Sequence, residues 1–268
     1  MKMLVCVKQV PDTTEIKIDP VKNTLIRDGV ESILNPFDGY ALEAAARIKD
    51  ADPESEIVVL TMGPEQAKAV LTESLAIAAD KAYMVSGSEF CGSDTLCTSY
   101  IISEAIKEIE KTEGKFDIIF CGKQAIDGDT AQVGPEIAEH LGYPQVTYAL
   151  ESFVQEDGSV KVKKEGEDGN VMIGIKTPCV LTFTKPSFDP RYPTIKRKMA
   201  AKKVKIPVLA FADIPDIDEG KIGLNNSPTR VKKTFVPQKK TGGIKIQEEA
   251  VEDSSMKLFQ MLSDAHVI

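Results

Sequence analysis

Residues 116–141 read FDIIFCGKQAIDGDTAQVGPEIAEHL, and this stretch decides the fold class. Phe116–Cys121 is short, apolar and continuous, which is typical of a strand that helices cover on both faces. Thr130–Leu141 is expected to form a helix, and a loop that contains Gly122 and Gly128 joins the two. The stretch therefore predicts a strand–loop–helix unit of an α/β protein.

The same unit repeats towards the N-terminus. Strand-like runs at Met3–Gln9, Glu56–Met62 and Lys81–Val85 alternate with helical patterns, which span Asp38–Lys49, Glu65–Ile77 and Asp94–Lys111. Strands in a βαβ series pack in parallel, so we expect a doubly wound, mostly parallel, Rossmann-like sheet.

The alternation of predicted strands and helices ends after Gly142. Four extended runs separated by turn signals predict antiparallel strands that extend the sheet or cover its edge: Gln145–Gln155, Ser159–Glu165, Val171–Ile175 and Cys179–Thr184. From Lys221 the chain shows little periodicity until Glu248–Leu262, where a last helix is expected. We therefore expect an α/β domain over 1–220 and a C-terminal arm over 221–268.

Composition excludes several classes of protein. The 268 residues include 33 basic and 41 acidic side chains, for a formal charge of -8, which argues against a protein that binds nucleic acid by neutralising phosphates. No run of about 18 apolar residues predicts a membrane span, and the N-terminus lacks a signal sequence, so we expect a cytoplasmic protein. The five cysteines predict neither a disulfide framework nor, with two histidines, a metal site.

One segment is basic, although the chain as a whole has a net negative charge. Residues 185–205 hold eight basic side chains and one acidic side chain. Such a local concentration of positive charge is a candidate docking surface.

The loops that follow parallel strands are where ligands of such sheets bind. Among these loops, Gly122–Pro135 contains the most features of a ligand-binding loop. Free backbone amides at Thr130–Val133 would form a phosphate-binding site at a helix N-terminus. The alternative is a simple loop capped by Asp129 or Thr130. No Walker or dinucleotide glycine motif is present, so ATP hydrolysis has no support.

Candidate catalytic side chains are weak by comparison. His140 is interpreted as a surface or packing residue, and capping explains the carboxylates of Asp12, Asp38, Asp127 and Asp129 more simply than a metal site does. No nucleophile, base and orienting group occur together.

Five motifs in order carry a resemblance that covers nearly the whole chain: Val5–Val10 (VCVKQV), Asn35–Phe37 (NPF), Gly63–Pro64, Gly122–Asp127 (GKQAID) and Pro190–Tyr192 (PRY). They resemble the β subunit of electron-transfer flavoproteins. The resemblance implies an adenine-nucleotide α-hydrolase-like fold and a heterodimer with an α subunit that carries FAD, and we expect the C-terminal arm over 221–268 to wrap that subunit.

Position by position, the resemblance assigns two sets of site residues. The cofactor-binding residues would be Cys6, Asn35, Pro36, Phe37, Asp38, Met62, Gly122, Lys123, Gln124, Ala125, Ile126, Asp127, Gly128, Asp129, Thr130, Ala131, Gln132 and Val133. The partner-binding residues would be Arg191, Tyr192, Ile195, Arg197 and Lys198, with Ile195 as the apolar anchor unless it is a core residue of a helix that starts at Pro193.

The loop around Gly128 is most similar to the electron-bifurcating group of anaerobic bacteria. That group implies FAD in this subunit, NADH as hydride donor, and two acceptors: ferredoxin and a flavoprotein dehydrogenase of acyl-CoA, enoyl-CoA or lactate type. One alternative is a housekeeping relay of single electrons, which holds structural AMP in the same site. A remote alternative is an adenine-nucleotide-sensing protein.

Overall fold

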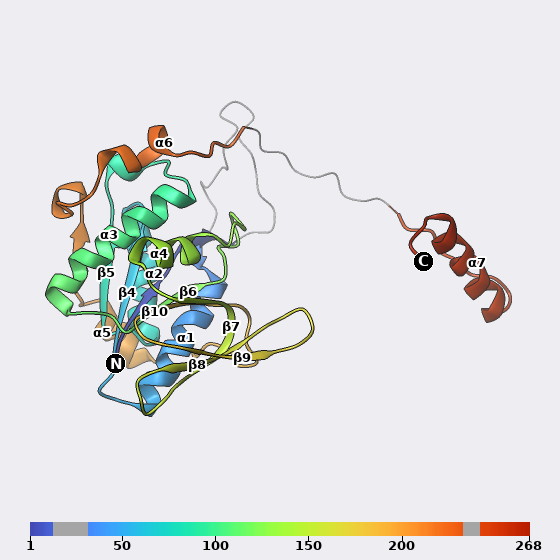
Figure 1. The fold of residues 1–268 in the computed structure, drawn as a ribbon, viewed down its shortest axis with the longest axis horizontal. Coiled ribbons are helices and arrows are strands. Elements are labelled where there is room, and N and C mark those ends of the chain that lie inside the picture. Colours follow the sequence, from blue (N-terminus) through green and yellow to red (C-terminus); the bar gives the residue numbers. More distant parts are fainter. Residues whose placement is uncertain (13–31, 233–241) are drawn as a thin grey trace.

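Nine strands form one sheet in the computed structural model, which describes residues 1–12, 32–232 and 242–268. Their order across the sheet is β11-β5-β4-β1-β6-β10-β7-β8-β9 (Figure 1). The strands are β1 (Lys2–Cys6), β4 (Glu56–Met62), β5 (Lys81–Val85), β6 (Ile118–Gly122), β7 (Gln145–Val154), β8 (Val160–Lys164), β9 (Val171–Ile175), β10 (Cys179–Phe183) and β11 (Val208–Leu209).

Strand β1 lies near the centre of the sheet because its apolar side chains need cover on both faces. Met3, Leu4 and Val5 have no exposed surface, and β1 pairs in parallel with β4 on one side and β6 on the other. The chain builds outward from β1 to β4 and β5, and then returns to the other side of β1 for β6. The strand order therefore reverses between β1 and β6, where open α/β sheets bind ligands.

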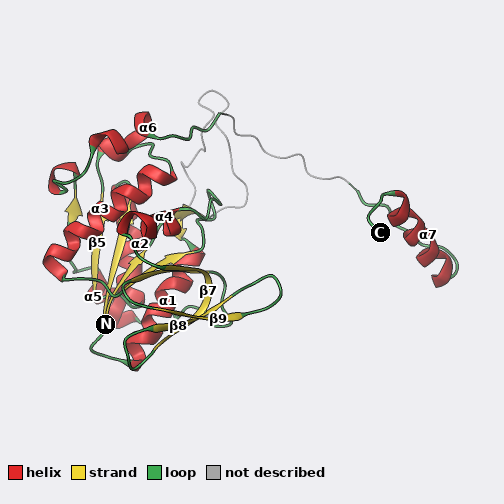
Figure 2. Ribbon diagram, in the orientation of Figure 1, coloured by secondary structure: helices red, strands yellow, loops and turns green. Residues whose placement is uncertain are grey.

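Helices cover both faces of the sheet (Figure 2). Helices α1 (Pro36–Ala51) and α2 (Lys68–Ile77) bury their apolar sides in one core cluster. Helices α3 (Thr95–Glu113) and α4 (Val133–Leu141) bury theirs in the other. This arrangement confirms the doubly wound fold that the alternation of strands and helices predicts.

The region after Gly142 is only partly as expected. All four predicted strands form, but β10 pairs in parallel with both β6 and β7, so antiparallel pairing is confined to β7–β8 and β8–β9. The expectation that all four were antiparallel was wrong. Cys179–Phe183 is buried at every position, because neighbouring strands pair with both of its edges and helices α1 and α4 cover its two faces.

Several boundaries also differ from the sequence predictions. The predicted helix over 65–77 begins as a short 3₁₀ segment, Glu65–Ala67, before α2, and α4 begins at Val133 instead of Thr130. A small antiparallel pair, β2 (Gln9–Pro11) and β3 (Ser32–Leu34), precedes α1. The other 3₁₀ segments are Ser88–Phe90, Phe211–Asp213 and Glu219–Lys221.

The C-terminal third lies over the surface of the sheet domain and then leaves it. Helix α5 (Ile195–Ala201) packs against α2, and the segment around α6 (Gly223–Asn226) packs against α3, where Ser227 and Ile222 are buried. The predicted last helix forms as α7 (Val251–Asp264), which stands apart from the α/β body (Figure 1). No helix among the described residues is long and apolar enough to cross a membrane.

Candidate functional site

A cleft of about 390 Å³ opens at the carboxyl ends of β1, β4 and β6, where the strand order reverses. Helices α3 and α4 border it with their N-terminal turns. Its lining consists of Cys6, Val7, Lys8, Asn35, Asp38, Met62, Ser93, Asp94, Thr95, Thr98, Ile102, Cys121, Gly122, Lys123, Gln124, Ala125, Gly128, Thr130, Ala131, Gln132, Val133 and Gly134.

Most residues that the sequence assigns to a cofactor lie in this lining. The exceptions are Pro36, Phe37, Ile126, Asp127 and Asp129. Asp127 contacts the cleft indirectly, since its carboxylate binds the Lys8 ammonium at 2.6 Å. The fold thus brings four sequence-distant segments to one place.

Two side chains at the start of α1 hold the cleft loops together. Asp38 accepts hydrogen bonds from the backbone amides of Lys8 at 2.7 Å and Gly122 at 3.1 Å. Asn35 donates to the Gln124 carbonyl and accepts from the Ile126 amide. Both side chains are almost fully buried, so their hydrogen bonds position the cleft walls.

Asp38 carries an unusual protonation equilibrium. Burial raises the pKa of this carboxyl to about 7, against the hydrogen bonds that favour its ionised form. A charged group at the cleft floor therefore titrates near neutral pH.

The glycines of the cleft differ in how much space their surroundings leave for a side chain. A Cβ on Gly122 would lie 2.3 Å from Asp38 Oδ1 and 2.8 Å from the Phe37 carbonyl carbon, so only glycine permits this close approach to α1. A Cβ on Gly134 would lie 2.6 Å from Thr182 Cγ2. A Cβ on Gly128 would meet nothing within 4 Å. Gly128 therefore leaves space at the cleft that the fold itself does not need.

The loop before α4 presents backbone to the cleft. Asp129 and Ala131 have φ values of 52° and 53°, a left-handed conformation that costs on the order of 1 kcal/mol in residues other than glycine. Gln132 is the N-cap of α4 and makes no side-chain capping hydrogen bond. The expected cap by Asp129 or Thr130 was wrong, because the helix starts later. Val133 and Gly134, the first two residues of α4, line the cleft, and no side chain caps the helix, as an anion site requires.

Sequence reasoning missed one wall of the cleft. Ser93, Asp94, Thr95 and Thr98 come from the loop after β5 and the first turn of α3, a loop that was not singled out. Asp94 is the N-cap of α3 and accepts from the Cys97 amide at 3.0 Å. The Ser-Asp-Thr sequence after a predicted strand was the signal, since it marks a helix N-terminus at the ligand-binding edge.

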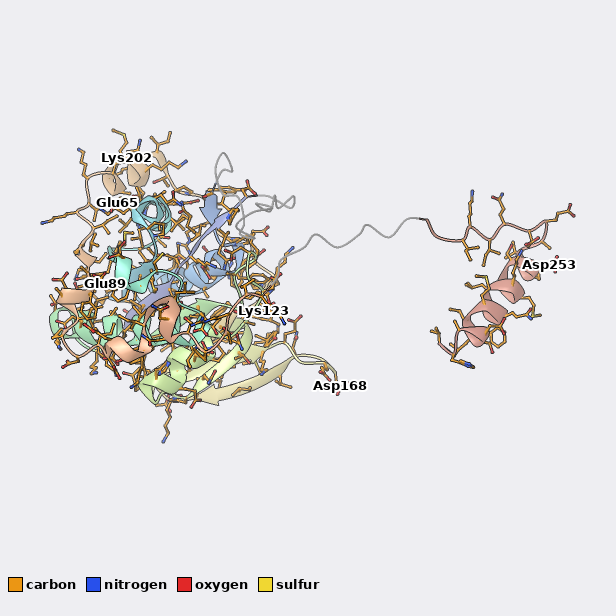
Figure 3. The ribbon with its side chains drawn as sticks, turned by 90° about the horizontal axis from the view of Figure 1, so that it is seen from above. Glu65, Glu89, Lys123, Asp168, Lys202 and Asp253 are labelled. Atoms are coloured by element: carbon orange, nitrogen blue, oxygen red, sulfur yellow. The ribbon has the colours of Figure 1, made fainter. Side chains whose placement is uncertain are left out.

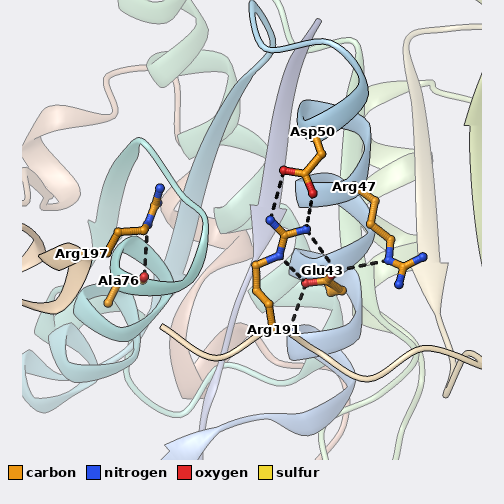
Figure 4. A network of polar contacts seen from close by, with 6 residues as sticks. All are labelled: Glu43, Arg47, Asp50, Ala76, Arg191 and Arg197. Atoms are coloured by element: carbon orange, nitrogen blue, oxygen red, sulfur yellow. Dashed lines mark hydrogen bonds and ion pairs between the residues drawn. The ribbon is translucent and has the colours of Figure 1, made fainter. Parts of the chain in front are cut away.

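The basic segment is anchored to the body by two arginines (Figure 4). The Arg191 guanidinium binds Glu43, which is 4% exposed, and Asp50, both on α1. Arg197 donates to backbone carbonyls at the C-terminal end of α2, among them that of Ala76 at 3.1 Å. Both predicted partner-binding arginines therefore spend their donors inside the chain and hold the segment in place.

The side chains between these anchors point outward. Tyr192 is 93% exposed and Ile195 is 79% exposed, so the alternative that Ile195 is a core residue was wrong. Ile195 begins α5 after an N-cap threonine instead of packing beneath the helix. Lys198 is exposed as well, and Lys202 projects from the same end of the molecule (Figure 3). Two large apolar side chains are therefore exposed within a region of positive charge.

The remaining candidates contribute little. The His140 ring packs edge-on against Tyr100 with centroids 5.6 Å apart, in agreement with a packing role. Residues 1–12, 32–232 and 242–268 contain no cluster of three or more His, Cys, Asp or Glu side chains arranged to hold a metal ion.

Comparison with known proteins connects this cleft to a family. The electron transfer flavoprotein domain matches residues 22–214, which is more than half of the chain. The chain belongs to the electron transfer flavoprotein family. The electron transfer flavoprotein subunit beta of Megasphaera elsdenii is 50% identical over 264 residues, which cover 96% of this chain and 97% of that protein. The family resemblance of the sequence motifs is therefore confirmed, and the chain has the β-subunit role.

Two further relatives carry more specific names. The caffeyl-CoA reductase-Etf complex subunit CarD of Acetobacterium woodii is 46% identical over 268 residues and covers both chains completely. The acryloyl-CoA reductase electron transfer subunit gamma of Anaerotignum propionicum is 44% identical, over 97% of this chain and 98% of that protein. The adenine-nucleotide-sensing alternative is set aside by these matches.

Proposed function

We propose that this β subunit holds an FAD in the cleft, pairs with an α subunit, and takes part in flavin-based electron bifurcation. The observation that carries the proposal is the uncapped N-terminus of α4, which faces a cleft at the switch point of the sheet. The names of the relatives from Acetobacterium woodii and Anaerotignum propionicum support the link to CoA-ester reduction.

The residues present fit an adenine dinucleotide. The backbone amides of 130–134 would bind a diphosphate, since the Asp129 amide already donates to the Ala125 carbonyl, and Gly128 leaves room beside them. The ammonium group of Lys123 adds positive charge to the lining, whereas that of Lys8 is paired with the Asp127 carboxylate. Bound FAD would supply the redox chemistry, and these residues bind and orient it.

The floor of the cleft is less polar. Cys6, Met62, Ile102 and Cys121 lie beneath the loops, at the ends of the central strands and on α3. Such side chains exclude water from a bound ring system and favour stacking over hydrogen bonding. No side chain here has to donate or accept a proton, in keeping with the absence of a catalytic trio in the sequence.

The proposal also includes a hydride donor and two electron acceptors. We expect NADH to deliver a hydride to the complex, ferredoxin to accept one electron, and a flavoprotein dehydrogenase of acyl-CoA, enoyl-CoA or lactate type to accept the other. The exposed Tyr192 and Ile195, which Arg191 and Arg197 hold in place, are the docking surface that we assign to the dehydrogenase.

One observation favours the alternative of a housekeeping relay with AMP. The cleft volume of about 390 Å³ lies near the lower end of the range of about 300–1,000 Å³ for small-molecule sites. A mononucleotide fills such a cleft, whereas a dinucleotide has to extend beyond it towards a partner subunit.

The experiment is to co-express the chain with an α subunit and quantify the nucleotides that heat releases from the complex. Two FAD per heterodimer support the proposal, one FAD with one AMP supports the relay, and no nucleotide refutes the cleft as a binding site. Stopped-flow bleaching of the flavin by NADH then tests the donor, and an unbleached complex excludes NADH.

Two matched variants localise the nucleotide. Gly128→Asp places a carboxylate at the cleft, and Gly174→Asp places one on β9, where a Cβ also meets nothing within 4 Å. We expect Gly128→Asp to lose the β-subunit nucleotide through charge repulsion with the diphosphate, and Gly174→Asp to retain it. Equal nucleotide content in both variants would place the ligand elsewhere.

A further inference from the structure

Two cysteine thiols lie side by side on the floor of the cleft, and the proposed function uses neither for chemistry. In the parallel register of β1 and β6, Val5 pairs with Phe120, so Cys6 and Cys121 are neighbours one residue further along. Both side chains belong to the face that α3 and α4 cover, and both line the cleft. Neighbouring strands lie about 4.8 Å apart, within the range of Cα separations of about 4.4–6.8 Å that a disulfide spans.

The two thiols also interact directly. A hydrogen bond with the Cys6 thiol is the largest cause that raises the pKa of Cys121, and burial adds to it. The Cys121 thiol is thus held protonated beneath its neighbour. Cys6 is the more accessible of the two, since it is half-buried while Cys121 is buried.

We propose that Cys6 and Cys121 form a redox-active dithiol, which a hydroperoxide converts into a disulfide when the cleft is empty and which a bound adenine nucleotide shields. The shielding rests on the proposed function, whereas the oxidation does not. The strand register singles out this pair among the described cysteines. Cys91 is exposed in a loop, Cys97 is buried on α3 and accepts a hydrogen bond from the Ser227 hydroxyl, and Cys179 is buried in the sheet.

The reaction balances in two steps. The Cys6 sulfur attacks one peroxide oxygen, the O–O bond breaks, and a sulfenic acid and one molecule of water (or alcohol, from an organic hydroperoxide) form. The Cys121 sulfur then attacks the Cys6 sulfur, the S–O bond breaks, and the leaving hydroxyl departs as water with the Cys121 proton. The two thiols lose two electrons in total, and the peroxide gains them.

The pKa of Cys121 determines the expected pH dependence of the second step. Because the thiolate is the attacking species, a raised pKa slows closure at neutral pH, and closure accelerates as the pH rises. Cys179 is a matched buried control, since burial raises the pKa of its thiol to about 12 without a neighbouring thiol.

The test uses the full chain, reduced without oxygen, freed of nucleotide, and then treated with hydrogen peroxide. After alkylation and trypsin, mass spectrometry looks for residues 3–8 joined to residues 116–123 with the loss of two hydrogens. We expect this product in the wild type and in Cys179→Ser, and not in Cys6→Ser. In Cys121→Ser, we expect a Cys6 sulfenic acid that dimedone traps. Absence of the joined peptide from the wild type, while Cys91 is oxidised, overturns the dithiol.

A second arm adds FAD or AMP before the peroxide, with binding measured in the same sample. At a nucleotide concentration of about ten times Kd, roughly one cleft in ten stays empty, so disulfide formation slows about tenfold. Unchanged oxidation with a nucleotide bound overturns the shielding. Failure of both nucleotides to bind the chain, with the joined peptide still formed, counts against the proposed function and leaves the dithiol supported.

Discussion

Replacing Gly122 with alanine tests the close approach that builds the cleft. The added Cβ would lie 2.3 Å from Asp38 Oδ1, 2.8 Å from the Asp38 amide nitrogen and 2.8 Å from the Phe37 carbonyl carbon. Two of these atoms are backbone at the start of α1, so a change of side-chain rotamer does not relieve the overlap. The strain also weakens the hydrogen bond from the Gly122 amide to the Asp38 carboxylate.

The expected loss of unfolding free energy follows from these contacts. Overpacking costs about 1–3 kcal/mol, and weakening a buried hydrogen bond adds about 1 kcal/mol, so Gly122→Ala should lose about 2–4 kcal/mol of unfolding free energy. For a domain of this size, that loss lowers Tm by roughly 5–15 °C.

Thermal and urea denaturation followed by circular dichroism measure the effect. Gly128→Ala is the matched control, because the new Cβ meets no atom within 4 Å, and its Tm should stay within about 1 °C of the wild type. The reasoning is refuted if Gly122→Ala melts with the wild type, or if Gly128→Ala falls as far.

Three further predictions address charge and docking. Burial raises the pKa of Asp38 to about 7, so between about pH 4 and 7 the folded state keeps a proton that the unfolded state releases. The unfolding free energy of the wild type relative to Asp38→Asn should therefore fall as pH rises through this range, by at most about 1.4 kcal/mol per pH unit. Urea denaturation at several pH values measures this difference. A constant difference would contradict this assignment. Arg191→Ala leaves the buried Glu43 with Arg47 as its remaining cationic partner and should cost about 1–3 kcal/mol by thermal denaturation. The exposed Lys196→Ala should cost less than about 0.5 kcal/mol, and similar losses in both variants would show that the ion pair does not anchor the segment. Ile195→Ala should leave Tm unchanged and weaken binding to a dehydrogenase by about 1–2 kcal/mol in titration calorimetry, and unchanged affinity would remove Ile195 from the docking surface.

The alternation of strands and helices could be predicted because it is a local property. Continuous apolar runs such as Met3–Val5 and Ile118–Cys121 have no polar side that could face water, so each predicts a strand covered on both faces. Turn signals likewise located all four strands after Gly142. Their pairing directions were not predictable in the same way, because an extended run has the same local pattern in a parallel and in an antiparallel neighbourhood.

The sequence by itself determined the family, the parallel core and the loop Gly122–Pro135, because these depend on residue order and on hydrophobic periodicity. The tertiary structure alone decided that Asn35 and Asp38 act as supports of the cleft walls, since their partners lie 30 to 91 residues away along the chain. It also decided that Arg191 is an internal anchor while Ile195 is exposed, although both occur in one basic segment. Such roles depend on which segments meet in space, and a contact between distant residues leaves no local pattern in a single sequence.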